Sequence, residues 1–176
     1  MIDFAADHFA LFGLPRRFRV DAGALDRAYR ALQSDVHPDR FAAADDASRR
    51  LALQSSARVN EAYETLRDPA CRGEYLLGLS GIASLAETDT AMPMDFLGEQ
   101  MERREAIDEA RAAGDHAALE AALDALIVDA RALESALAAA LDDSGDLAAA
   151  KSLVRKLRFL QRVRQEITEA LIEAEA

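Results

Sequence analysis

The stretch Asp35-Val36-His37-Pro38-Asp39-Arg40-Phe41 decides how the N-terminal half folds, because it separates two segments with helical apolar spacing. Pro38 fixes its own φ, has no N–H to donate, and pushes His37 out of the helical region. The helix that runs into Val36 must therefore end there. An imidazole and the carboxylate of Asp39 are left on a short, stiff, exposed loop, which is typical of a docking tip.

The composition favours an all-helical chain. Half of the 176 residues are apolar, and the chain has only eight glycines and four prolines. Such a mixture, rich in alanine and poor in aromatics, is typical of helical proteins. Three histidines and one cysteine exclude a disulfide framework and a cysteine-rich metal site, so we expect neither metal nor cofactor.

Three further features predict a soluble, cytoplasmic protein. The lone thiol of Cys71 fits a reducing cytosol. The N-terminus, Met1-Ile2-Asp3, lacks the basic-then-apolar pattern of a signal peptide. No uninterrupted apolar run is long enough to cross a bilayer, so we expect no membrane association.

Charge is distributed unevenly along the chain. Residues 1–79 carry 11 Lys and Arg against 12 Asp and Glu, a net charge of −1, whereas residues 80–176 carry 10 against 20, a net charge of −10. A strongly acidic second half argues against nucleic-acid binding, which requires a basic surface. It suits a basic protein partner, although a solvated, solubilising surface explains most of these charges equally well.

The sequence divides into two helical units. Residues 80–94 lack helical periodicity and end near Pro93, so we expect a unit at 1–79, a linker at 80–94 and a second unit at 95–176. In the first unit we expect helices at about 7–12, 22–36 and 47–67, and a fourth through Tyr75 and Leu79. Asp21 is the predicted N-cap of the second of these helices, and Asp68-Pro69 ends the third. In the second unit we expect helices at about 95–113, 115–141 and 147–173, the middle one capped by Asp115, which short loops would close into an antiparallel three-helix bundle.

Apolar stripes mark the faces that these helices bury. The stripe of the helix at 47–67 begins at Leu51 and continues through Ser55 to Leu66. The long helix after Asp115 carries a seam of alternating three- and four-residue steps. The stripe of the last helix consists of Leu153, Leu157, Leu160, Ile167 and Leu171.

Four motifs together resemble a J domain. They occur in the order Phe9-Ala10-Leu11-Phe12-Gly13-Leu14-Pro15, Tyr29-Arg30-Ala31-Leu32, His37-Pro38-Asp39-Arg40-Phe41 and Val59-Asn60-Glu61-Ala62-Tyr63-Glu64-Thr65-Leu66-Arg67-Asp68-Pro69. The tripeptide alone is a weak signal, but in this order and at this spacing the resemblance is strong.

The remaining sequence narrows the resemblance to the HscB family of iron–sulfur cluster co-chaperones. The stretches that carry it are Arg72-Gly73-Glu74-Tyr75-Leu76-Leu77, Asp95-Phe96-Leu97 and Val154-Arg155-Lys156-Leu157-Arg158-Phe159-Leu160. The resemblance implies an N-terminal four-helix J domain and a C-terminal three-helix bundle. It also implies that the J domain docks on a DnaK-type chaperone of the HscA kind and stimulates its ATP hydrolysis, while the bundle holds the IscU-type scaffold protein.

The resemblance assigns chaperone contacts to the first unit. They would come from His37, Pro38 and Asp39, with the Asp39 carboxylate pairing a partner arginine. Arg27, Arg30 and Arg40 would add a basic face, although a plain solvated face is an equal alternative. Asp26, Asp35, Gln33 and Ser34 depart from the more basic pattern of general J domains.

The resemblance assigns scaffold contacts to the second unit. They fall on Leu97, Met101, Glu102, Glu105, Glu109 and Phe159. Gly98 stands where the family can place a bulkier apolar residue. At about 100° per residue, Phe96 and Ile107 share one edge of their helix while Leu97 and Met101 lie on another, so one edge can be core and the other an interface. Ordinary amphipathic packing, with Phe159 against Val163 at the core's edge, remains the alternative.

The sequence thus favours an all-α co-chaperone that is not an enzyme. Two other functions stay open. A general J-domain co-chaperone would bind exposed apolar peptides, and the lack of a Gly/Phe-rich region or zinc repeats speaks against it. A small helical enzyme using His37 or Cys71 would show turnover alone, and no accompanying nucleophile, base or pocket supports it.

Overall fold

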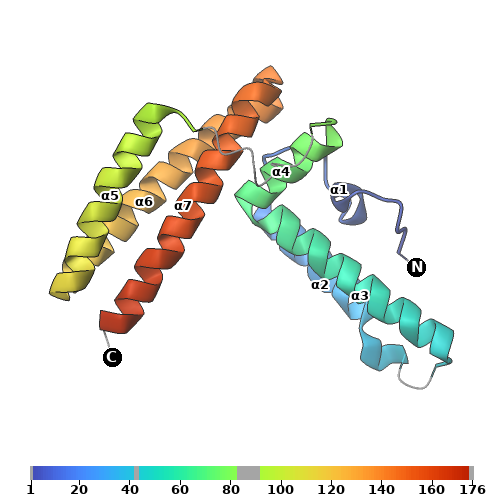
Figure 1. The fold of residues 1–176 in the computed structure, drawn as a ribbon. Coiled ribbons are helices and arrows are strands. Elements are labelled where there is room, and N and C mark those ends of the chain that lie inside the picture. Colours follow the sequence, from blue (N-terminus) through green and yellow to red (C-terminus); the bar gives the residue numbers. More distant parts are fainter. Residues whose placement is uncertain (1, 42–43, 83–91, 175–176) are drawn as a thin grey trace. The chain divides into compact units, whose positions relative to one another are not determined.

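Helices build both halves of the chain (Figure 1). The computed structural model describes residues 2–41, 44–82 and 92–174, and contains no strand within them. The first half holds α1 (His8–Leu11), α2 (Ala22–Val36), the 3₁₀ turn η1 (Pro38–Phe41), α3 (Asp46–Arg67) and α4 (Pro69–Leu79). The second holds α5 (Met94–Ala113), α6 (His116–Ala138), the π-helical turn η2 (Ala139–Ser144) and α7 (Leu147–Ala174). The predicted all-α class is confirmed.

Contacts between residues divide the chain into two units, Met1–Ser80 and Gly81–Ala176. Residues 83–91 of the linker expected at 80–94 lie outside the described residues. The last residue of that expected linker, Met94, already belongs to the first turn of α5.

Aspartates begin most of the helices. A side-chain carboxylate at the N-cap accepts a hydrogen bond from a backbone N–H in the first turn, which satisfies a group that has no partner inside the helix. The predicted cap Asp21 accepts from Ala24 N at 3.0 Å, and the predicted cap Asp115 accepts from Ala118 N at 3.0 Å. By contrast, α5 begins after Pro93 without a side-chain cap. In its first turn, Phe96 N donates instead to the Asp95 carboxylate at 2.8 Å.

The first unit packs α1, α2 and α4 around α3. Val59, Ala62 and Leu66 of α3 are fully buried, as their predicted stripe requires. The start of that stripe is wrong: Leu51 is 37% exposed, and Ala52, three residues before buried Ser55, takes the inner position. The Asp68-Pro69 break works as predicted, because Asp68 caps α4 and proline occupies its first turn.

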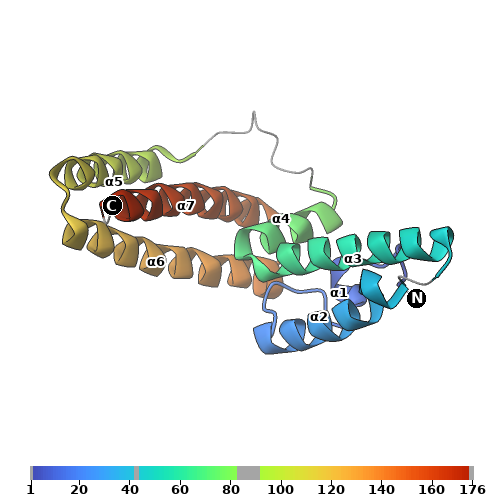
Figure 2. The same cartoon turned by 90° about the horizontal axis from the view of Figure 1, so that it is seen from below.

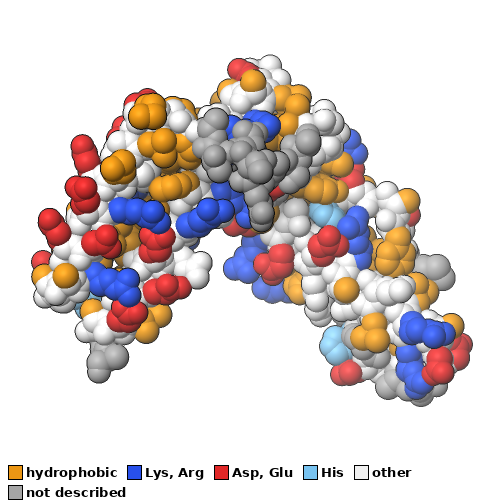
Figure 3. All heavy atoms as spheres, viewed as in Figure 1, with side chains coloured by type: hydrophobic (Ala, Val, Ile, Leu, Met, Phe, Trp, Pro, Cys, Tyr) orange, Lys and Arg blue, Asp and Glu red, His pale blue; other side chains and the backbone are white. Residues whose placement is uncertain are grey.

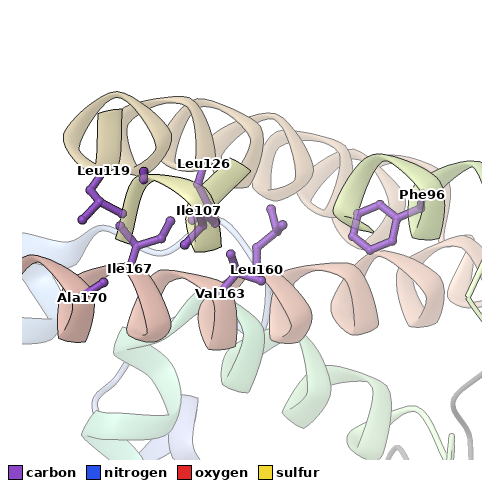
Figure 4. Packing of buried hydrophobic residues seen from close by; sticks show 9 residues of the cluster. Phe96, Ile107, Leu119, Leu126, Leu160, Val163, Ile167 and Ala170 are labelled. Carbon is purple, nitrogen blue, oxygen red and sulfur yellow. The ribbon is translucent and has the colours of Figure 1, made fainter. Parts of the chain in front are cut away.

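The second unit is a three-helix bundle with one continuous core (Figures 2 and 4). Its central residues come from all three helices: Phe96, Ile107, Ala110, Leu119, Leu126, Leu160, Val163, Ile167 and Ala170. The buried face of α7 is wider than the predicted stripe, since Val154 and Val163 are also fully buried while Leu153 and Leu171 are only half-buried. This helix packs against both α5 and α6, so a single seam does not describe it.

Two ion pairs fix the register of α5 on α7. Arg104 of α5 binds Glu166 of α7 at 2.5 Å, and Arg111 binds Glu173 at 2.5 Å. Both pairs join residues 62 positions apart in the sequence. An equal offset at two points means that the two helices run parallel along this contact. Because α5 contributes few large side chains to the core, these pairs help to set which of its faces points outward.

One core position of α5 holds a polar side chain. Gln100 is 4% exposed, and its Oε1 accepts no hydrogen bond within the described part of the chain. A buried polar group without a partner costs about 1–3 kcal/mol. We therefore expect Gln100→Leu to raise the free energy of unfolding by about 1 kcal/mol or more in urea denaturation. Gln165→Leu, the same change at an exposed position of α7, is the control; an equal gain there would contradict the explanation.

Because the His8 ring is buried, we expect the first unit to lose stability in mild acid. The His8 ring is 4% exposed and stacks on Tyr75 with ring centroids 4.1 Å apart. Burial lowers the pKa of His8, and the Arg58 guanidinium lowers it further, against the opposing charges of Glu61 and Asp7. The folded state therefore binds the proton less readily than the unfolded chain, whose imidazole titrates near pH ~6.5.

The stabilising contribution of neutral His8 is thus present above about pH 6.5 and declines as the pH falls below it. We expect urea midpoints measured between pH 8 and pH 5 to fall over this range. His8→Phe preserves the stacked ring and should flatten the decline. An unchanged pH dependence in His8→Phe would show that another group is responsible.

Candidate functional site

The loop after α2 presents an ordered His–Asp pair. The backbone of His37 leaves the helix with φ −58° and ψ 128°, as expected before a proline. The N–H of Asp39 donates to His37 Nδ1 at 3.3 Å, and the Asp39 carboxylate lies 3.5 Å from the same nitrogen. The side chain of His37 is 48% exposed and that of Asp39 is 90% exposed. Both groups are therefore available to a partner yet locally ordered.

Arg40 is tied to the helix before it. Its Nη1 donates to the Ser34 carbonyl at 3.1 Å and to the Asp35 carboxylate at 3.2 Å. This satisfies a carbonyl at the C-terminus of α2, where a cation is also favoured by the helix dipole. Arg27 and Arg30, in contrast, are exposed and form no ion pair within the described residues. Of the three predicted basic contacts, these two have the freer charges.

A cluster of polar and aromatic side chains joins α2 to α3. Tyr29 and Tyr63 stack with centroids 4.0 Å apart. Tyr63 donates to Asp26 at 2.9 Å, and this hydrogen bond raises the pKa of Tyr63. Gln33 donates to both Tyr29 Oη and Asn60 Oδ1 at 3.3 Å. Asp26 and Gln33 thus connect the two helices.

In α5, arginines and carboxylates face different directions. All three arginines of the helix form ion pairs within the bundle: Arg103 with Asp129 of α6, and Arg104 and Arg111 with α7. None of the exposed carboxylates of α5 forms an ion pair within the described residues; they are Asp95, Glu99, Glu102, Glu105, Asp108 and Glu109. Figure 3 shows acidic side chains along the outer edge of α5 and basic ones between α5 and α7. The outer face is therefore strongly acidic.

Apolar side chains lie within this acidic face. Met101 is 65% exposed, and Leu97, one turn earlier, is half-buried. Both were predicted as contacts. Met94, placed in the linker from sequence, is 82% exposed, more than any other large apolar residue in the described part of the chain. Its spacing of three from Leu97 and seven from Met101 is the sequence signal that could have revealed it. Figure 3 shows apolar side chains gathered over the N-terminal half of α5.

Phe159 packs at the margin of this surface. Its ring meets Phe96 edge to face, with centroids 5.7 Å apart and planes at 79°. The Arg104 guanidinium lies 5.8 Å from the Phe159 centroid, and Lys156 Nζ lies 5.0 Å from the Phe96 centroid. Phe159 is half-buried, so it both completes the core's edge and shows part of its ring to solvent.

The structure brings the predicted scaffold contacts onto one side of α5. At 100° per residue, the five predicted residues of α5 fall within a sector of about 140°, opposite buried Phe96 and Ile107. Leu97 is at the edge nearest Phe159 of α7, because Arg104, two turns further along the same edge, binds α7 and lies over that ring. The acidic helix and the aromatic residue thus form one continuous candidate surface.

Among the described residues, no group of three or more His, Cys, Asp or Glu side chains could hold a metal ion. Cys71 is half-buried near the start of α4. Within the same ranges, every helix is too short or too polar to cross a membrane.

Comparison with known proteins assigns the family. A family model described as the HSCB C-terminal oligomerisation domain matches residues 92–168. The co-chaperone protein HscB homolog of Azoarcus sp. strain BH72 is 48% identical over 170 residues, which cover 97% of this chain and 96% of that protein. This chain belongs to the HscB family. The HscB homolog of Paraburkholderia phymatum is 53% identical over 160 residues, 91% of each chain.

Solved structures of the HscB family share the fold. Chaperone HscB from Vibrio cholerae superposes with a TM-score of 0.84 at 37% identity, covering 96% of this chain and 99% of that one. The human co-chaperone protein HscB gives a TM-score of 0.87 at 32% identity, covering 94% and 82%. These matches confirm the predicted J domain joined to a C-terminal three-helix bundle, and the relatives are co-chaperones by name.

Proposed function

We propose that this co-chaperone binds an IscU-type iron–sulfur scaffold protein and delivers it to a DnaK-like chaperone of the HscA type. It stimulates that chaperone's ATP hydrolysis and carries out no chemistry itself. The observation that carries the proposal is the presence, in one chain of the HscB family, of an exposed His37–Asp39 pair on one unit and an acidic–apolar surface on the other. Each unit then has one partner.

The loop acts on the chaperone by binding one conformation better than another. Proline at position 38 and the bond from Asp39 N to His37 restrict the loop before it docks, which lowers the entropy lost on binding. The exposed Asp39 carboxylate can accept a bidentate arginine from the chaperone. Arg27 and Arg30 extend the contact along α2 toward an acidic partner surface.

The second unit holds the client through α5 and α7. Leu97, Met101 and the exposed part of Phe159 provide the apolar centre, and the carboxylates of Glu102, Glu105 and Glu109 form its rim. Interfaces commonly combine an apolar core with a polar rim, and unpaired carboxylates favour a basic partner.

Leu97→Ala tests the client surface. We expect it to weaken binding of the purified scaffold protein by about 1–3 kcal/mol in isothermal titration calorimetry, the range for a well-packed contact. Phe159→Ala should weaken binding similarly. It will also lower stability because the Phe96 ring loses its neighbour, so folding of each variant is checked by circular dichroism. Normal affinity in a folded double variant would contradict the assigned surface.

His37→Gln tests the chaperone surface. We expect scaffold affinity to stay unchanged, since the substitution lies on the other unit, while stimulation of chaperone ATP turnover is lost. Gln165→Leu, an exposed substitution on the second unit that lies outside both proposed surfaces, should retain full stimulation. Full stimulation by His37→Gln would show that this loop does not dock on the chaperone.

A further inference from the structure

A cavity of about 660 Å³ lies within the first unit, between its N-terminal segment, α2, η1 and α3. Its apolar walls include Leu11, Leu32, Val36, Phe41 and Leu51. Sites that bind small organic molecules commonly have volumes of about 300–1,000 Å³ and mostly apolar walls. The cavity therefore matches a ligand site in both size and lining, and all of its lining residues belong to one unit.

Small side chains keep this cavity open on the side of α3. The buried face of that helix carries Val59 and Leu66 toward its C-terminus, but only Ala52 and Ser55 at the cavity. Ala52 and Ser55 are 4% and 5% exposed, whereas Leu53 between them in the sequence is 57% exposed. A large apolar residue in this space would bury more apolar surface and so stabilise the unit. The sequence thus leaves the space unfilled at the expense of stability.

The charges of the cavity wall favour a positively charged ligand group. Both charged residues of the wall are aspartates, Asp3 and Asp35, and no Lys or Arg is among the described residues that line it. The Asp35 carboxylate is already paired with Arg40 at 3.2 Å. Asp3 accepts a hydrogen bond from Ala5 N at 2.9 Å, but it forms no ion pair within the described residues. The wall therefore carries a negative charge that a cation can balance.

The cavity also reaches both ends of the loop that holds His37 and Asp39. Val36 directly precedes His37, and Phe41 lies two residues after Asp39 at the end of η1. The side chains of His37 and Asp39 are exposed to solvent, whereas Val36 and Phe41 line the cavity. A molecule in the cavity would therefore contact this segment from inside the unit and leave its outer side accessible.

We propose that this cavity binds a small organic amine. The apolar body of the ligand lies among Leu32, Phe41 and Leu51, and its protonated amino group lies at the Asp3 carboxylate. None of the lining residues is among those proposed to contact the chaperone or the scaffold protein. The site is thus a further binding site, and it does not rest on the proposed co-chaperone function.

Binding of three matched probes to the full-length protein tests the proposal. Naphthylmethylamine, naphthylmethanol and naphthylacetate carry the same ring with a positive, a neutral and a negative group at neutral pH. In amide NMR spectra of the isotope-labelled protein, we expect the amine to cause saturable shifts centred on Leu32, Val36, Phe41 and Ala52. The amine should bind about three- to fivefold more tightly than the alcohol, the range for a solvent-exposed ion pair, and the acetate should bind most weakly.

Two substitutions separate the apolar body from the amino group. Ala52→Leu fills the cavity without changing the net charge, so it should abolish binding of all three probes while the melting temperature stays equal or rises. Asp3→Asn can still accept the hydrogen bond from Ala5 N. It should lower the affinity for the amine to that for the alcohol and leave the affinity for the alcohol unchanged. Ala57→Leu, at an exposed position of α3 outside the cavity, is the control and should bind all probes normally.

The proposal is wrong if no probe shifts the signals of the lining residues saturably, or if folded Ala52→Leu binds the amine normally. Equal affinities of the unchanged protein for the amine and the alcohol would overturn the assigned amino group. Amine shifts spread over the exposed carboxylates of α5 instead would mean nonspecific attraction to a chain of net charge −11, and would also contradict the site. If Ala52→Leu does not fold, Asp3→Asn still decides, because an undiminished preference for the amine in that variant contradicts the proposal.

Discussion

The inward ion pairs of α5 are the constraint on which the proposed client surface depends. This helix buries only Phe96, Ile107 and Ala110 as apolar core residues, together with Gln100, whose Oε1 has no partner. Such a narrow apolar face only weakly determines how the helix is rotated about its own axis. Arg104 and Arg111 add two specific contacts to α7, and Arg103 adds one to α6. With every arginine directed inward, the carboxylates and methionines of the same helix must face outward.

This arrangement separates stability from binding. Exposed ion pairs each contribute about 1 kcal/mol or less, so their main effect is on orientation rather than on the free energy of folding. The outward carboxylates of α5 form no ion pair within the described residues of the bundle. The outward Met94 and Met101 bury little of their side-chain surface. These side chains can therefore contact a partner without loss of interactions inside the bundle. The first unit shows the same separation, since Tyr29 and Tyr63 hold α2 on α3 while His37 and Asp39 remain exposed.

Much of the fold could be predicted from the sequence because the signals are local. The proline after His37, the Asp68-Pro69 break and the caps at Asp21 and Asp115 each act within one helical turn, and all lie where the sequence places them. The burial of individual side chains was harder to predict. Leu51 is 37% exposed rather than buried, since the buried line of α3 depends on where α1 and α2 pack.

The arrangement of the surface proposed to bind the client could be predicted only in part. The helical wheel separates Leu97 and Met101 from the buried edge, but it gives no information about which charges are already paired. That Arg104 lies over Phe159 and binds Glu166 depends on the position of a helix about 60 residues away in the chain. The sequence did not place Met94 on the helix, because it marks Pro93 as a boundary without showing that the helix begins immediately after it. The roles of the individual contact residues remain predictions.

We propose that the two units bind different partners, a claim that the steady-state ATP turnover of the HscA-type chaperone can test. Turnover is measured with this protein alone, with the scaffold protein alone, and with both. If one unit presents the client while the other engages the chaperone, the two proteins together stimulate turnover by more than the sum of their separate effects. Stimulation by this protein that the scaffold does not increase would contradict the claim and favour a general J-domain co-chaperone.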